Sequence, residues 1–173
     1  MTTPNMKRRQ CLIGACGLGL GMALGAAAEV PPPGSIDTEP YPRDAGEALA
    51  RLKKGNQRFI DDKPLHDRQE SSWRSLLVET QKPFATVLGC SDSRVPPELI
   101  FDVGFGELFT IRLAGNIIAR DVIGSLQYAV RHLHTSLVVV LGHESCGAVT
   151  ATVDEMLHKP TEPEYIGAPI QLI

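Results

Sequence analysis

The sequence of 173 residues contains few aromatic side chains and no excess of positive charge. Aromatic residues make up 5% of the chain but hydrophobic residues make up 43%, so we expect a globular core rather than a disordered chain. The formal net charge of −3 argues against a nucleic-acid partner, because such a partner requires a basic face. The length suits a single domain, and no internal repeat is visible.

Acidic residues are absent from the first 28 positions. A basic stretch from Lys7 to Arg9 precedes residues 11–28, which carry no charge and are rich in Gly, Ala and Leu. Three alanines at 26–28 suit a signal peptidase, so we expect residues 1–28 to be an export signal peptide. The pair Arg8-Arg9 resembles a twin-arginine signal, which predicts a periplasmic or secreted protein with no stable membrane contact after cleavage.

Two other interpretations of this segment stay open. The uncharged stretch is close to the length of about 20 residues that spans a bilayer, so the segment could be an uncleaved anchor. The residues before Cys16 also loosely resemble a lipid-attachment site.

Cysteine is scarce, and its four copies divide unevenly. Cys11 and Cys16 lie inside the expected signal, which leaves Cys90 and Cys146 for the mature chain. In an exported protein such a pair first suggests a disulfide. Metal ligation is the competing interpretation, and the motifs around the two cysteines favour it.

The remaining sequence predicts a proline-rich linker at 29–43 and a folded domain at 44–173. Asp44 is a candidate helix cap with Glu47 as its reciprocal partner, and Leu49, Leu52 and Phe59 share a helical period. Apolar runs predict three strands, at 84–89, 108–113 and 137–141. A helix capped by Asp121 is expected before the third strand, and a further helix is expected after it, at 146–158. This alternation predicts an α/β fold with a mainly parallel sheet flanked by helices on both faces.

Two polar clusters directly follow the first and third predicted strands, at 90–94 and 143–147. The carboxyl ends of parallel strands meet at one edge of a sheet, where sites form in α/β folds. Two thiolates and one imidazole, from Cys90, Cys146 and His143, suit Zn²⁺. The fourth position would be open for water or for Asp92, and zinc makes hydroxide available near neutral pH.

These motifs resemble those of the β-class carbonic anhydrases. The resemblance rests on GCSDSRVPPELIFD at 89–102, ELFTIRLAGN at 107–116 and LGHESCGAV at 141–149, and it extends from about residue 44 to the end. It implies reversible hydration of carbon dioxide to bicarbonate and a proton by a zinc-bound hydroxide, in a homodimer or higher homo-oligomer. A zinc enzyme acting on carbon disulfide and an inactive zinc-binding protein remain alternatives. Relatives usually continue beyond the equivalent of Ile173, so we expect the C-terminal part of the family fold to be missing and stability to be reduced.

The resemblance also implies a role for each site residue. Cys90, His143 and Cys146 would hold Zn²⁺, and Asp92 would pair with Arg94 or, in a closed state only, bind the metal itself. Gln81, nine residues before Cys90, would donate a hydrogen bond to the substrate. Thr86, Val87 and Leu88 stand where some relatives carry a Trp, so no inhibitory bicarbonate pocket is expected. His132 and His134 are interpreted as favourable charges near a helix end rather than as proton shuttles.

Overall fold

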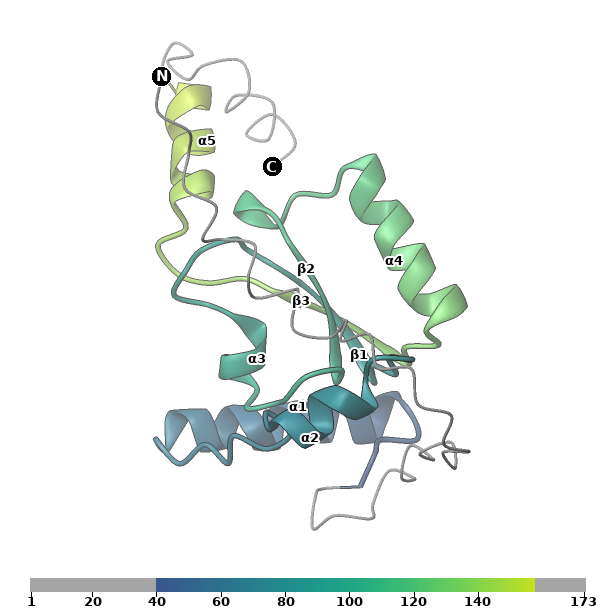
Figure 1. The fold of residues 1–173 in the computed structure, drawn as a ribbon. Helices are drawn as coiled ribbons and strands as arrows, with labels where there is room; N and C mark the ends of the chain where they lie inside the picture. The colour runs from purple at the N-terminus through teal and green to yellow at the C-terminus, as the bar shows by residue number, and fades with distance from the viewer. Residues whose placement is uncertain (1–39, 158–173) are drawn as a thin grey trace, which may run out of the picture. The chain divides into compact units, whose positions relative to one another are not determined.

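The structure is a computed structural model that describes residues 40–157 (Figure 1). The chain divides into residues 1–30 and 31–173, and all described residues belong to the second unit. The predicted signal at 1–28, most of the predicted linker and residues 158–173 lie outside the described part. No helix between residues 40 and 157 has the length and apolar character needed to cross a membrane.

Three parallel strands form a sheet in the order β2-β1-β3. The strands are β1 at Ala85–Gly89, β2 at Leu108–Arg112 and β3 at Leu137–Leu141. Every residue of the central strand β1 is buried, as expected for an apolar strand covered on both faces. In register, Gly89 pairs with Arg112 on one side and with Leu141 on the other, so the three strands end together.

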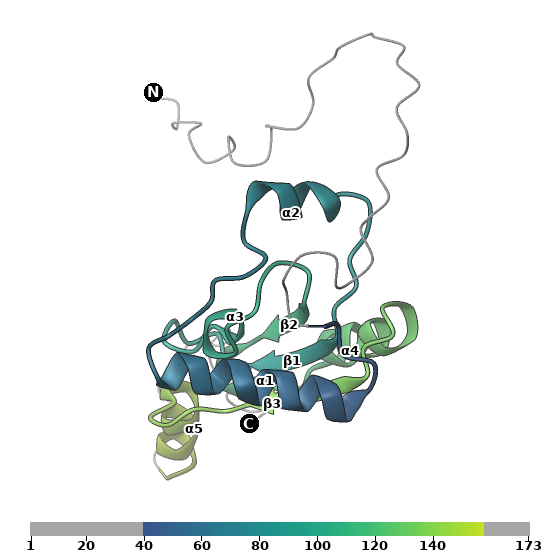
Figure 2. The ribbon, with the colours of Figure 1, turned by 90° about the horizontal axis from the view of Figure 1, so that it is seen from below.

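Helices cover both faces of this sheet, which confirms the predicted α/β class. The α-helices are α1 at Ala45–Ile60, α2 at Ser71–Leu76, α3 at Pro97–Ile100, α4 at Arg120–His132 and α5 at Gly147–Leu157, and a short 3₁₀ turn, η1, spans Ala114–Asn116. Figure 2 shows α1 lying along the sheet. Alternate residues of β1 face opposite layers: Val87 packs toward α1, whereas Leu88 packs toward α4.

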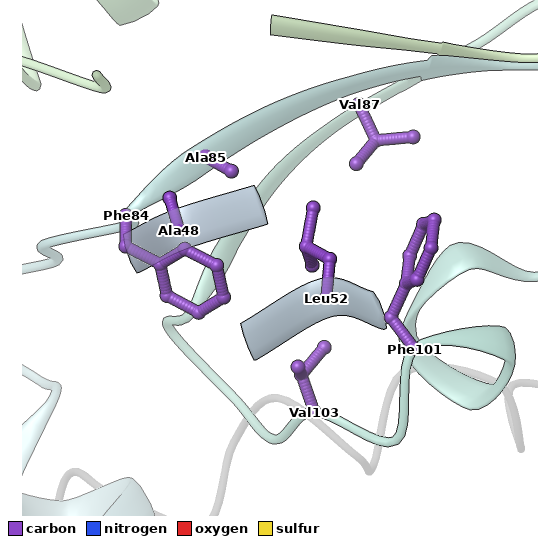
Figure 3. Packing of buried hydrophobic residues seen from close by; sticks show 7 residues of the cluster. All are labelled: Ala48, Leu52, Phe84, Ala85, Val87, Phe101 and Val103. Carbon is purple, nitrogen blue, oxygen red and sulfur yellow. The ribbon is translucent and has the colours of Figure 1, made fainter. Parts of the chain in front are cut away.

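The larger core cluster joins α1 to β1 and to the segment after α3 (Figure 3). Its buried members are Ala48, Leu52, Phe84, Ala85, Val87, Phe101 and Val103. The smaller cluster on the other face contains Leu88, Ile111 and Val122, with Leu126 packed against it. The two clusters fix β1 between its layers, and β1 carries the first part of the candidate site.

A buried polar cluster ties α1 to the segments before and after α3. The carboxylate of Glu107 accepts hydrogen bonds from Arg51 and Arg68, and its second oxygen accepts one from the Gly104 N–H at 2.7 Å. Glu107, with 2% of its surface exposed, is thus a fully partnered buried charge, which is the condition under which such a charge is tolerated.

The predicted cap of α1 is confirmed, but its reciprocal half differs by one residue. Asp44 Oδ1 accepts the Glu47 N–H at 2.9 Å. The Glu47 carboxylate accepts the backbone N–H of Arg43, at 2.8 Å, instead of that of Asp44, because Arg43 also grips this carboxylate with its side chain.

The predicted cap at Asp121 is wrong, and the buried face of α1 differs from its apolar positions. Helix α4 begins after Ala119 without a side-chain cap, and Asp121 lies in its first turn, where a negative charge still favours the helix dipole. Leu49 and Phe59 on α1 are 39% and 48% exposed, because the buried stripe runs through Ala48 and Leu52.

The third strand is also less buried than its apolar sequence predicts. Leu137, Val139 and Leu141 pack against the larger core cluster. Val138 and Val140 point to the other face and are 44% and 64% exposed, because β3 is an edge strand of the described sheet and α4 packs over β2 instead.

Candidate metal centre

Cys90, His143 and Cys146 come together at the carboxyl edge of the sheet. Cys90 directly follows β1, His143 lies two residues after β3, and Cys146 directly precedes α5. Because Gly89 and Leu141 are paired in register, both loops leave the sheet at the same level. One ligand atom from each residue lies within 4.8 Å of the others, and the two Sγ atoms are 4.0 Å apart.

The imidazole of His143 is oriented as a metal ligand would be. Its side chain is only 7% exposed, and its Nδ1 lies 2.9 Å from the carbonyl oxygen of Glu144. A carbonyl can only accept, so Nδ1 carries the hydrogen, and whenever the ring is neutral it presents its lone pair at Nε2. This Nε2 is buried without a hydrogen-bond partner, which is unusual unless another group completes it.

The surroundings of Cys90 lower the pKa of its thiol. Burial raises its pKa, but His143, the N–H groups of Gly115 and Asp92, and the Cys146 side chain together lower the pKa to about 7. The nearby Cys90 in turn raises the pKa of His143. Metals bind the thiolate rather than the thiol, so this surrounding favours metal ligation.

Asp92 and Arg94 form a two-point pair beside these ligands. Arg94 Nε donates to Asp92 Oδ1 at 2.9 Å and Nη2 donates to Oδ2 at 2.7 Å, and the Arg94 backbone N–H also donates to Oδ1. The guanidinium holds the pKa of Asp92 well below its usual range. Asp92 Oδ2 lies 3.9 Å from the unpartnered Nε2 of His143, so the carboxylate borders the space between the ligand atoms.

The last residue of β2 and the turn after it brace this edge, and the sequence interpretation gave them no place in the site. Arg112 Nε donates to the Cys90 carbonyl at 2.8 Å and its Nη2 donates to the Asp92 carbonyl at 2.5 Å. The Gly115 N–H points to Cys90 Sγ at 3.4 Å, and Asn116 bonds the ends of two strands. The Gly-Asn pair was the available signal, since both types readily adopt positive φ.

Other residues singled out from the sequence lie elsewhere. Gln81 lines a cavity at the amino ends of the strands with Tyr41, His132 and His134. Since β1 separates Gln81 from Cys90, one copy of the chain does not bring Gln81 to the ligand group. The His132 ring lies against Tyr128, with 5.2 Å between centroids.

Comparison with known proteins places the chain in a family. The carbonic anhydrase family model matches residues 85–173. The carbonic anhydrase of Mycolicibacterium smegmatis is 50% identical over 109 residues, which are 63% of this chain and 53% of that protein. Carbonic anhydrase 2 of Mycobacterium tuberculosis is 50% identical over 106 residues, covering 61% and 51% respectively.

A solved structure agrees with this assignment. The Coccomyxa β-carbonic anhydrase in complex with acetazolamide superimposes with a TM-score of 0.53 at 30% identity, covering 71% of this chain and 54% of that one. The chain therefore belongs to the carbonic anhydrase family, in its β class. It spans about half the length of the curated relatives it matches.

Proposed function

We propose that this chain binds one Zn²⁺ through Cys90, His143 and Cys146 and catalyses the reversible hydration of carbon dioxide to bicarbonate. The observation that carries the proposal is the buried, unpartnered Nε2 of His143 facing two thiols that lie 4.0 Å apart. Two sulfurs and one nitrogen are the donor set of zinc sites that leave a fourth position open.

Bound zinc would supply hydroxide near neutral pH, because it lowers the pKa of a water molecule to about 7. Asp92 stays ionised through its pair with Arg94, and its position beside His143 Nε2 lets it accept a proton or a hydrogen bond there. Arg94 Nη2 also donates to the Ser145 carbonyl at 3.1 Å, so it couples Asp92 to the loop that carries Cys146. Release of that grip would free Asp92 to enter the fourth position, which is the proposed closed state.

The wider assignments are proposals of the same kind. A homodimer or higher homo-oligomer is supported by the exposed apolar residues Val138 and Val140 on β3. The predicted role of Gln81 would require a second copy to supply this side chain. Export to the periplasm or outside the cell is supported by the basic, uncharged and small-residue order of residues 1–28.

A matched pair of histidine variants tests the function. In the purified zinc-loaded chain, we expect one zinc per chain and stopped-flow hydration of carbon dioxide. His143→Ala should lose both zinc and activity, whereas His132→Ala should keep both because that ring lies away from the ligands. One bound zinc per chain without hydration of carbon dioxide would refute the proposed activity and leave a metal-binding protein. An assay with carbon disulfide would then test the alternative substrate.

A further inference from the structure

One side chain joins the two strands that lead to the proposed metal ligands. Asn116 Nδ2 donates to the Leu141 carbonyl at 2.8 Å and to the Leu88 carbonyl at 3.3 Å. Leu88 lies two residues before Cys90 on β1, and Leu141 lies two residues before His143 on β3. The same amide nitrogen is thus bonded at the same distance along the chain from a ligand in each of the two loops.

The backbone of the turn explains why an asparagine can do this. Gly115 and Asn116 have φ values of 69° and 57°, a left-handed conformation that asparagine adopts more readily than most residues. The turn carries the chain from the end of β2 across the end of β1, so the side chain can reach β3. An amide NH₂ has two hydrogens and no acceptor capacity, and both hydrogens are directed to carbonyl oxygens here.

The same turn also contacts a ligand atom directly. With Asn116 in place, the Gly115 N–H lies 3.4 Å from Cys90 Sγ. Helix α5, which begins directly after Cys146, packs against the turn as well. The turn therefore touches the segments that carry all three ligands.

We propose that Asn116 is a positioning residue that sets the separation of the Cys90 loop from the His143 loop and so tunes metal binding. This inference rests on the proposed zinc site. Groups that orient metal ligands from outside typically change metal affinity or activity 10- to 100-fold when they are replaced.

Two substitutions test the proposal. Asn116→Asp keeps the size of the side chain but replaces the donors with oxygens that face two carbonyls. Asn116→Gly removes the amide and keeps the left-handed backbone, so it gives the same comparison should the aspartate variant not fold. For each full-length variant, zinc affinity is measured by competition with a chromophoric chelator, and the absorption spectrum of the cobalt(II)-substituted protein reports ligand geometry.

The matched control is Asn56→Asp. Asn56 Nδ2 donates to the Ile100 carbonyl at 3.2 Å, between α1 and α3. The control therefore makes the same amide-to-carboxylate change at a bond that does not involve the ligand loops. We expect zinc affinity to fall about 10- to 100-fold in both Asn116 variants, with an altered cobalt spectrum, and to stay unchanged in Asn56→Asp.

The outcomes separate this inference from the proposed function. A wild-type chain that binds no zinc would refute the metal site and the inference with it. A wild-type chain with one zinc, together with Asn116 variants of equal affinity and unchanged cobalt spectrum, would overturn the inference alone. A loss of thermal stability matched by Asn56→Asp, without a change in metal binding, would also overturn it, because it would show a purely structural bond.

Discussion

At the scale of single residues, the site depends on groups whose charge is set by their neighbours. Asp92 is kept ionised by Arg94, and it lies 3.9 Å from the nitrogen that faces the ligand sulfurs. The Arg94 side chain is 60% exposed, so its pair with Asp92 contributes little to the stability of the fold. Its main effect is to hold the Asp92 carboxylate in place beside the ligands.

We therefore predict that Asp92→Asn lowers carbon dioxide hydration by about 100-fold or more and leaves the zinc content unchanged, since an amide cannot take the proton that a carboxylate takes. Stopped-flow kinetics and metal analysis on the same sample measure both quantities. Asp121→Asn is the control, because Asp121 is an exposed carboxylate in the first turn of α4. Full activity in Asp92→Asn would remove Asp92 from the mechanism.

Cys90 gives a prediction about pH for the metal-free, reduced chain. Its folded-state pKa of about 7 lies below that of an unfolded thiol, so ionisation of Cys90 stabilises the fold at high pH. This contribution is fully present above the unfolded pKa and is lost as the pH falls through about 7. The free energy of unfolding of the wild type, minus that of Cys90→Ser, should rise with pH between those two values. A difference that is flat across this window would contradict the assigned pKa.

At the scale of elements, the close approach of α1 to the end of α3 depends on a missing side chain. A Cβ on Gly55 would lie 1.7 Å from the Phe101 carbonyl oxygen and 2.7 Å from its carbon. These are backbone atoms, so the helix or the following segment would have to move.

We predict that Gly55→Ala destabilises the chain by about 1–3 kcal/mol in urea unfolding, despite the better helix propensity of alanine. Gly124→Ala on α4 is the matched control, since a Cβ there meets nothing within 4 Å. It should stabilise the chain by about 0.5–1 kcal/mol. Equal effects of the two substitutions would show that the α1 contact does not require glycine.

The elements themselves were largely predictable because their signals are local. Apolar runs located all three strands to within a residue, and Asp44 located the start of α1. The degree of burial was not predictable. Val140 on β3 is exposed although its strand is apolar, and Ile123 and Val130 on α4 are exposed although they are apolar residues of that helix. Burial depends on what packs over a face, and periodicity within one segment does not contain that information.

At the scale of the whole molecule, the ligand set could be predicted because a parallel register brings the ends of β1 and β3 to one edge. The bracing by Arg112 and Asn116 could not, because it depends on two positive φ values and on side chains that reach across strands. The spacing of Gln81 from Cys90 indicated the family but did not predict the distance between the two side chains. The extended strand β1 lies between them and places them at opposite edges of the sheet.

The convergence of Cys90, His143 and Cys146 on one metal ion is the claim on which the proposed chemistry depends. Zinc X-ray absorption spectroscopy of the purified, zinc-loaded chain tests it most directly, because it reports the atoms bound to the metal. We predict two sulfur ligands at about 2.3 Å and one nitrogen at about 2.0–2.1 Å, with a lighter atom in the fourth position. A zinc ion surrounded only by oxygen and nitrogen, with both thiols still free to alkylation, would contradict the account.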